Sequence, residues 1–320
     1  MDRRFLLLAA AGVPAPTLRA QGAWPERPIR VVIPNAPGSS VDTIGRLLGN
    51  ELGKVLPQPL VMDNRAGAAG AIGVEAVRQA APDGYTVLVG STSAITVAPL
   101  LQKAVTYQPL RDFDYVALMA LLPNVLVCNP ALPVQNVAQL VAYARGRGDS
   151  SHMASAGIGS ASHLAGVALQ AAAGFKSLHV PYKGGSQGVA SVVAGETDWV
   201  LTPAPAAMSL VQAGRLRLLG HSMAPALRPV GDTPSIGSTI AGFEFAGWIG
   251  LMAPRGLPAR VTETLSQAVA RALQSPDLRR GFDTNGALPQ GSSPEDFRAY
   301  VARDNETTRK AIALAGVQPE

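Results

Sequence analysis

Short apolar runs alternate with segments of helical periodicity along nearly the whole chain. The apolar runs predict strands, which we expect near Ile29, Leu60, Thr86, Val125, His152, Leu178, Trp199 and Leu216. Helices are expected between most of them. Strands that alternate with helices usually pair in parallel through βαβ crossovers, so this pattern predicts the α/β fold class with helices on both faces of each sheet.

Two of the predicted strands lead into loops of small residues, and each loop opens a helix. The first loop spans residues 34–42 and its helix ends near Gly53, whereas the second spans residues 155–163 and its helix ends near Gly174. A helix N-terminus carries unpaired N–H groups and the positive end of the helix dipole. Two such ends aimed at one cleft predict a binding site for an anion.

Two stretches interrupt the alternation and suggest how the chain is divided. Residues 115–130 are apolar and punctuated by proline, and residues 225–258 are rich in glycine and proline. The βαβ series between them could form its own sheet, while helical segments at 259–274 and 294–315 would return to the first domain. The sequence therefore predicts domain 1 at 23–122 and 246–320, domain 2 at 123–245, two crossovers and a central cleft.

The first residues follow the plan of a secretory signal peptide. Arg3 and Arg4 precede an apolar run at 5–11, and small residues at 20–22 offer a cleavage site before Ala23. The apolar run is too short to span a bilayer. We expect residues 1–22 to be removed on export to the periplasm, by either the Sec or the twin-arginine route.

Composition narrows the class of protein further. The chain is 47% hydrophobic and 15% charged, and its formal net charge of +5 comes from scattered basic residues rather than a stripe, so nucleic acid is not the expected partner. The single cysteine, Cys128, lies in an apolar run and is expected to be buried. The four histidines show no ligand spacing with other candidate ligands, so no metal site is predicted. His163, in the first turn of its helix, is expected to have a structural or domain-contact role.

Two short motifs suggest other functions, but each fits the motif of that function only in part. Gly157-Ile158-Gly159 lacks the third glycine of a dinucleotide fingerprint, and no acidic residue ends the next strand, so no cofactor is expected. Residues 184–188 fit the Gly-x-Ser-x-Gly elbow of serine hydrolases around Ser186. However, Ser186 lies too far beyond its strand, and the only later histidine, His221, sits in an apolar run. The simpler interpretation is that Ser186 caps the following helix.

Several motifs spread over the chain resemble one family. They are Pro34-x-x-Pro37-Gly38-x-x-x-Asp42, Asp63-Asn64-Arg65-x-Gly67-Ala68-x-Gly70, Pro82-Asp83-Gly84-Tyr85-Thr86, Gly157-x-Gly159-Ser160-x-x-His163-Leu164, His179-Val180-Pro181-Tyr182-Lys183-Gly184 and Trp248-x-Gly250-x-x-x-Pro254. Together they resemble the Bug-type extracytoplasmic solute receptors of tripartite tricarboxylate transporters, in order from about residue 27 to about residue 300.

The resemblance implies a two-domain periplasmic binding protein of the type II, Venus-flytrap architecture that closes on a small organic carboxylate. Such a receptor is not an enzyme, delivers its ligand to a membrane permease, and is expected to be a monomer. A periplasmic serine esterase using Ser186, or a sensory adaptor that presents bound ligand to a membrane kinase, remain alternatives from the sequence.

The resemblance also implies which residues form the site. The expected backbone donors are Ala36, Gly38, Ser39, Ser40, Ala156, Gly157, Gly159 and Ser160. Further lining residues are expected at Asn35, Ala68, Ser91, Thr92, Lys183, Thr202 and Pro203. Lys183 is a candidate cation at the cleft rim.

Two departures from the family pattern are informative. Ser39 stands where the family usually has a second glycine, and Ser39 with Asp42 fits the Ser-x-x-Asp capping pattern, so Asp42 is expected to cap its helix rather than meet an anionic ligand. Asn35 stands where many members carry an aromatic residue. A buried amide needs hydrogen-bond partners, which predicts a ligand with a polar or second charged group rather than a bare aromatic acid.

Overall fold

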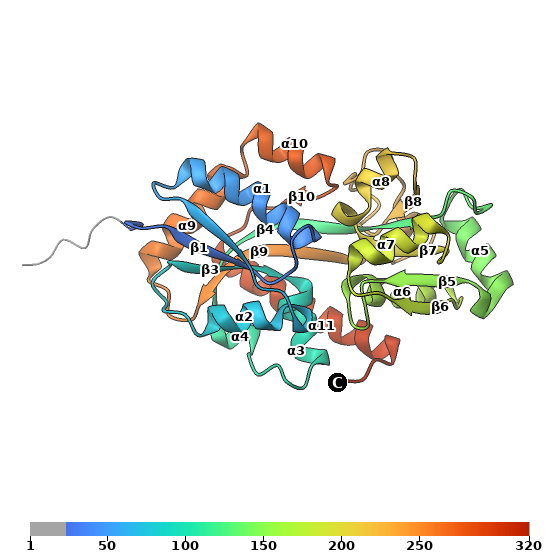
Figure 1. Cartoon of the computed structure of the whole chain (residues 1–320), viewed down its shortest axis with the longest axis horizontal. Coiled ribbons are helices and arrows are strands. Elements are labelled where there is room, and N and C mark those ends of the chain that lie inside the picture. The colour runs from blue at the N-terminus through green and yellow to red at the C-terminus, as the bar shows by residue number, and fades with distance from the viewer. Residues whose placement is uncertain (1–23, 320) are drawn as a thin grey trace, which may run out of the picture.

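The computed structural model describes residues 24–319 and shows two lobes, joined by strands that run between them (Figure 1). The predicted signal peptide at 1–22 lies outside the described residues. No helix among the described residues is long and apolar enough to cross a membrane.

The lobe that contains the N-terminal strands is called lobe 1, and its sheet combines parallel and antiparallel pairing. β1 (Ile29–Ile33) lies between β2 (Leu60–Asn64) and β3 (Thr86–Ser91) and is parallel to both. β9 (Ala246–Pro254) then pairs antiparallel with β3 and with β4 (Phe113–Cys128), and the short β10 (Leu288–Pro289) pairs with β4 at the side. The central strands are therefore contributed by distant parts of the chain.

Helices cover both faces of this sheet, which explains why its strands are almost uniformly apolar. Val31 and alternate residues of β1 pack with α1 (Ser40–Val55), α9 (Ala259–Ala272) and α10 (Pro276–Thr284). Val32 faces the opposite side, toward α2 (Ala71–Arg78) and α11 (Pro294–Ala315). The short helices α3 (Ala98–Leu101) and α4 (Pro109–Asp112) lie near α2 (Figure 1).

Lobe 2 repeats the α/β plan around a smaller sheet. In it β5 (His152–Ser155) pairs in parallel with β6 (Leu178–Pro181) and β7 (Trp199–Pro203), and β7 and β8 (Arg217–His221) pair with the second half of β4. The helices are α5 (Val137–Arg147), α6 (Ala161–Ala173), α7 (Gly185–Ala194) and α8 (Met208–Gln212). Shorter helical turns within residues 24–319 are η1 (Ala68–Gly70), the π-turn η2 (Thr92–Val97), η3 (Gly148–Ser150), η4 (Ala204–Ala206) and η5 (Ile236–Ser238).

β4 passes from one lobe to the other without a break. It pairs with β9 as far as Pro123, and from Asn124 onward it pairs with β7 and β8. Hydrogen bonds fix this exchange of partners, because the Asn124 N–H donates to Ser222 Oγ and the Asn124 side-chain amide donates to the Phe245 carbonyl. The exchange lies beside the boundaries expected at 122/123 and 245/246.

The sequence pattern does not predict two elements of the fold, β9 and α10. Residues 225–258 were interpreted as a passage rich in glycine and proline, yet β9 occupies 246–254, and α10 follows α9 where no helix was expected. β9 is buried on both sides, so its residues show no alternation of apolar and polar positions from which a strand could be predicted. By contrast, α11 has the predicted bounds.

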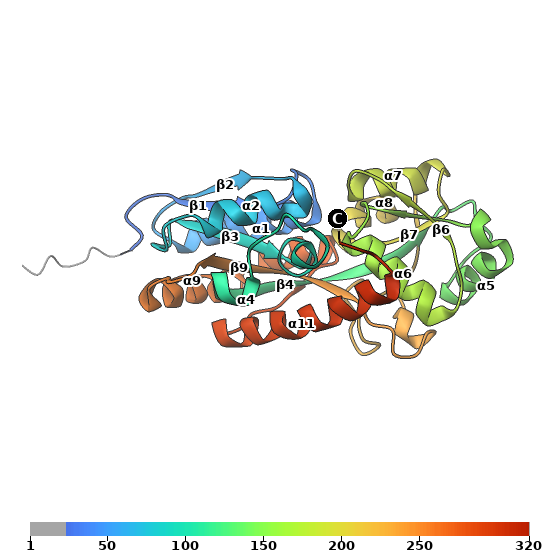
Figure 2. The same cartoon turned by 90° about the horizontal axis from the view of Figure 1, so that it is seen from below.

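α11 also contacts both lobes. Its first half packs on the sheet of lobe 1, as expected, while its C-terminal half reaches α6 of lobe 2 (Figure 2). There Ile312 joins a small apolar cluster with Leu101 of α3 and Leu164 of α6. This helix therefore supports the junction between the lobes from one side.

Candidate ligand-binding site

The two strand–loop–helix turns are built in the same way. Gly38 and Gly159 have left-handed φ angles of 76° and 73°, and the following serines, Ser39 and Ser160, are N-caps with nearly equal ψ angles of 162° and 161°. In each turn the glycine N–H donates to the side chain four residues later. The two lobes therefore present two helix N-termini of matching construction.

In the first turn the capping prediction is confirmed. Ser39 Oγ accepts the Asp42 N–H at 3.2 Å, and Asp42 Oδ2 accepts the Gly38 N–H at 2.8 Å. The Asp42 carboxylate also accepts from Arg46 Nε and Asn64 Nδ2, each at 2.8 Å, and the residue is buried. Asp42 is thus held inside its own lobe with a compensating cation.

In the second turn all four expected backbone donors already have partners within the protein. The N–H of Ala156 donates to Ser162 Oγ, that of Gly157 to Ser155 Oγ, and that of Gly159 to His163 Nδ1, at 2.9, 3.0 and 3.0 Å. The Ser160 N–H donates to the Gly157 carbonyl. Direct contact between these amides and a ligand stays a prediction, and it would require an exchange of hydrogen-bond partners.

Two stacked imidazoles lie beneath the second turn. The rings of His163 and His179 are 4.0 Å apart between centroids, with 13° between their planes. Burial lowers the pKa of His163 to about 4, with a smaller contribution from His179, and burial also lowers the pKa of His179. Both rings are therefore neutral at pH 7. The histidine spacing in the sequence gave no sign of this pair.

The end of β3 and the turn before α2 complete the lobe 1 side. Ser91 and Thr92 are buried, and Thr92 Oγ1 accepts the Trp248 N–H at 2.9 Å, which ties this strand end to β9. Ala68 lies in a turn whose residues Ala68 and Ala69 have φ angles of 45° and 49°. A Cβ on Gly70 would approach the Pro34 carbonyl, so this turn lies against the start of the first loop.

Asn35 has one unsatisfied atom. Its side-chain Oδ1 is buried and has no hydrogen-bond partner among the described residues, while its backbone carbonyl accepts from Asn64 Nδ2 at 3.0 Å. An unpaired buried acceptor is unfavourable by about 1–3 kcal/mol, so this atom favours the presence of a donor from a water or a ligand.

On the lobe 2 side the expected residues differ in exposure. Thr202 is buried at the end of β7, and Pro203 follows it, pairing with Asn124 where β4 exchanges partners. Lys183 is exposed and its N–H donates to Gln187 Oε1. A Cβ on Gly157 would lie 3.1 Å from the Tyr182 carbonyl, so Lys183 directly follows a segment that touches the second turn.

The prediction that Ser186 caps its helix is wrong. The N-cap of α7 is Gly184, whose φ of 154° is a conformation that favours glycine. The helix has no side-chain capping hydrogen bond. Ser186 is exposed, whereas His221 is fully buried and its Nδ1 accepts the Met223 N–H. The structure therefore does not bring the serine and the histidine of the esterase hypothesis together.

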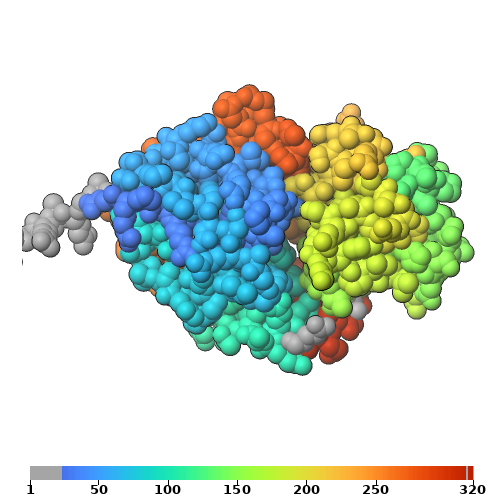
Figure 3. Space-filling model, viewed as in Figure 1, coloured from blue at the N-terminus to red at the C-terminus, as the bar shows by residue number. Residues whose placement is uncertain are grey.

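The lobes meet beside the second turn. A Cβ on Gly159 would lie 2.5 Å from Leu101 Cδ1, so α3 of lobe 1 touches the loop of lobe 2 directly. Figure 3 shows the resulting narrow seam between the two lobes.

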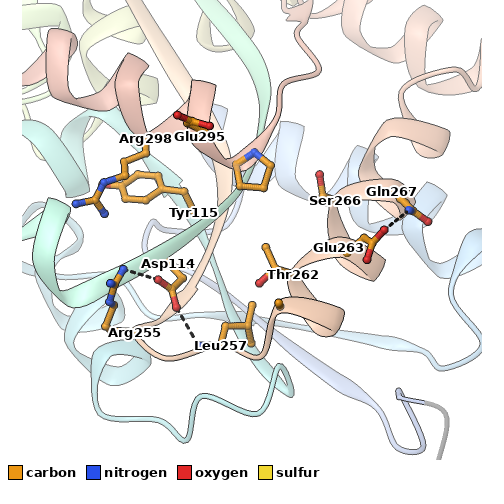
Figure 4. Close-up of a pocket in the computed structure, with 12 residues that line it drawn as sticks. Asp114, Tyr115, Arg255, Leu257, Thr262, Glu263, Ser266, Gln267, Glu295 and Arg298 are labelled. Atoms are coloured by element: carbon orange, nitrogen blue, oxygen red, sulfur yellow. Dashed lines mark hydrogen bonds and ion pairs between the residues drawn. The ribbon is translucent and has the colours of Figure 1, made fainter.

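Two cavities among the described residues lie outside the two turns. One of about 580 Å³ is bounded by α9 and the N-terminal end of α11 in lobe 1, where Arg255 pairs with Asp114 and Arg298 lies over Tyr115 (Figure 4). Another of about 300 Å³ lies between Phe245 and α11, and Thr92, one of the expected lining residues, borders it. Neither cavity is lined by residues of the two turns.

Comparison with known proteins identifies the fold and the family. Residues 44–316 match the family described as "Tripartite tricarboxylate transporter family receptor" (TctC). The chain belongs to this family. It is therefore a solute-binding receptor of the TctC, or Bug, type and not an enzyme.

Relatives and solved structures agree along the full length. The chain is 35% identical to the "UPF0065 protein in tcbD-tcbE intergenic region" of Pseudomonas sp. (strain P51), over 97% of this chain and 93% of that protein. It is 31% identical to BugT of Bordetella pertussis, over 98% and 96%. Among structures, R. palustris Rpa4515 with adipate has a TM-score of 0.87, with 31% identity over 93% of this chain and all of that one.

A second ligand-bound relative is MatC of Rhodopseudomonas palustris with bound malate, with a TM-score of 0.80 and 28% identity over 90% of this chain and all of that one. The periplasmic binding protein BugD superposes with a TM-score of 0.83 and 28% identity, over 93% of this chain and all of that one. These TctC/Bug structures confirm the predicted α/β periplasmic-binding-protein fold.

Proposed function

We propose that this receptor binds a small organic carboxylate in the seam between its lobes and delivers it to the membrane permease of a tripartite tricarboxylate-type transporter. One observation carries the proposal: each lobe offers a serine-capped helix N-terminus, at Ser39 and at Ser160, and both begin at the expected loops. Adipate and malate in two related receptors support a carboxylate as the ligand class.

The electrostatics of the site support an anion. The positive ends of α1 and α6 add to each other if both face one carboxylate. The nearby side chains add little opposing charge, because Asp42 is paired with Arg46 at 2.8 Å and the imidazoles of His163 and His179 are neutral.

The far end of the ligand is the part that Asn35 would select. Its buried, unpaired Oδ1 favours a ligand that donates a hydrogen bond, directly or through a water, over a bare aromatic acid. We therefore propose a carboxylate that also carries a hydroxyl or amino group, which can donate to Oδ1, or a second carboxylate that reaches Oδ1 through a bridging water.

The proposal extends to where the receptor acts and how its chain is divided into domains. We propose export to the periplasm with removal of residues 1–22, and division into domain 1 (23–122 and 246–320) and domain 2 (123–245), hinged where β4 exchanges partners between Pro123 and Asn124. The monomeric state stays a prediction.

A thermal-shift screen tests this function. A ligand that binds the native state raises the melting temperature by mass action. We expect a concentration-dependent rise with at least one member of a panel that contains malate, adipate, amino acids and benzoate, and no rise with the matched diamides. If none of these carboxylates shifts the melting temperature of the processed, folded protein, the proposed function is wrong.

A further inference from the structure

The His163–His179 pair is connected to both glycines of the second loop. His163 Nδ1 accepts the Gly159 N–H at 3.0 Å. His179 Nε2 lies 2.6 Å from Ser155 Oγ, and that same Oγ accepts the Gly157 N–H at 3.0 Å. Because the two rings stack, they form one support under the Gly157–Gly159 segment.

The first loop uses a different acceptor at the position that His163 occupies in the second loop. There the acceptor for the equivalent glycine N–H is the Asp42 carboxylate, whose charge is compensated by Arg46. In the second loop the acceptor at the same position is an imidazole nitrogen. Both Nδ1 of histidine and Oδ of aspartate or asparagine are bonded to Cγ, so these side chains can present an acceptor to the same backbone amide.

The hydrogen bond fixes the protonation state of His163. A nitrogen that accepts an N–H carries no proton, so the ring proton of neutral His163 must be on Nε2. The titratable group that faces His163 is His179, and burial together with that neighbour lowers the pKa of His163 to about 4. The loop is therefore held by a neutral group at pH 7.

We propose that His163 and His179 are positioning residues that set the shape of the second ligand loop, with His163 acting as the acceptor for the Gly159 amide. This inference rests on the proposed function, because it assigns the pair to a loop expected to bind the carboxylate. A neutral support holds the loop without placing a negative charge beside an anionic ligand, which a carboxylate at position 163 would do.

Two substitutions separate the acceptor from the ring. His163→Phe keeps an aromatic ring for stacking on His179 and removes the acceptor, whereas His163→Asn restores the acceptor and removes the ring. We expect the Phe variant to lose protection of the Gly159 amide in hydrogen exchange and to bind malate or adipate about tenfold more weakly. We expect the Asn variant to recover most of both. Equal behaviour of the two variants would overturn the assignment.

The wild-type protein provides a test that needs neither a variant nor a ligand. Imidazole ¹⁵N chemical shifts at pH 7 should show His163 with Nδ1 unprotonated and Nε2 protonated. A proton on Nδ1 would overturn the inference. If the wild-type protein binds no carboxylate, the proposed function fails, while the tautomer and the Gly159 exchange rate still decide the role of His163.

Discussion

At the scale of single residues, two unfavourable backbone conformations lie beside the expected site. Ala68 and Ala69 both have positive φ angles, which are unfavourable for residues with a Cβ. Such strain persists where surrounding structure imposes it, and it often lies at functional sites. Gly70 and Gly73 lie close against Pro34, which places this turn beside the first loop.

We predict that Ala69→Gly increases the free energy of unfolding by about 0.5–1 kcal/mol, because glycine adopts φ of 49° without the Cβ clash. The matched control is Ala213→Gly, at an exposed position with φ of −77°, which should decrease stability by about 0.4–1 kcal/mol through the unfolded state. Urea denaturation measures both. Destabilisation by Ala69→Gly equal to that of the control would show that the turn is not strained.

The lowered pKa of His163 predicts a pH dependence of stability. Between the unfolded value of about 6.5 and the folded value of about 4, only the unfolded chain is protonated at this residue, so the free energy of unfolding decreases as the pH falls through that window. The contribution of His163 is up to about 3 kcal/mol. His163→Asn, measured by urea denaturation from pH 7 to pH 4, should lose less stability than wild type. Parallel profiles would contradict this prediction.

At the scale of elements, the sequence predicted local features and missed those set by distant contacts. Ser39 as the cap of α1 follows from Ser-x-x-Asp within four residues, and it is confirmed. The Ser186 cap was wrong because backbone geometry at Gly184 begins α7 earlier. β9 has no alternating pattern because helices cover both its faces. The stacking of His163 on His179 joins α6 to β6, and no local pattern carries that information.

A partly buried carboxylate on α11 joins three elements of lobe 1. Asp304 Oδ2 accepts from Trp248 Nε1 of β9 at 2.6 Å and from Thr96 Oγ1 of η2 at 2.8 Å. Burial raises the pKa of Asp304 despite these two bonds, so the ionised form is destabilised in the folded state.

We predict that Asp304→Asn increases the free energy of unfolding at pH 7 by about 1 kcal/mol, because the amide oxygen still accepts both bonds and no charge is buried. The gain should diminish toward low pH, where Asp304 itself becomes neutral. Asp304→Leu should instead destabilise the protein by about 1–3 kcal/mol, since it leaves Trp248 Nε1 without its partner. Denaturation at pH 5 and pH 8 tests this, and a loss of stability in the Asn variant at pH 8 would contradict it.

At the scale of the whole molecule, the two lobes approach each other closely at one glycine beside the seam. Gly38 and Gly159 have nearly the same φ, but a Cβ on Gly38 has no heavy atom of the described residues within 4 Å, whereas one on Gly159 meets Leu101 of the other lobe. The two glycines therefore offer a matched pair for measuring lobe closure.

We predict that Gly38→Ala changes the affinity for the carboxylate only through backbone strain, of about 1 kcal/mol. Gly159→Ala should weaken binding further, because its methyl group also separates the lobes. Adding Leu101→Ala to Gly159→Ala should recover the extra affinity that Gly159→Ala loses, because the methyl group no longer meets the Leu101 side chain. The coupling energy in a double-mutant cycle should be about 1 kcal/mol. Additive effects of the two substitutions would show that this contact does not control closure.

The α/β fold class was predictable from the alternation of strands and helices, and so were the loops that begin α1 and α6. The choice of ligand was not, because it depends on which atoms of Asn35, Ser91 and Thr202 face the seam after the chain has folded. Side-chain orientation of that kind is set by packing between elements far apart in the sequence.

The most direct test is a crystal structure of the processed protein with the carboxylate that the thermal-shift screen selects. The proposal predicts one carboxylate group between the N-termini of α1 and α6, within hydrogen-bonding reach, directly or through one water, of residues 35–40 and of residues 156–160. A carboxylate bound only in the cavity between α9 and α11, or outside the seam altogether, would contradict it.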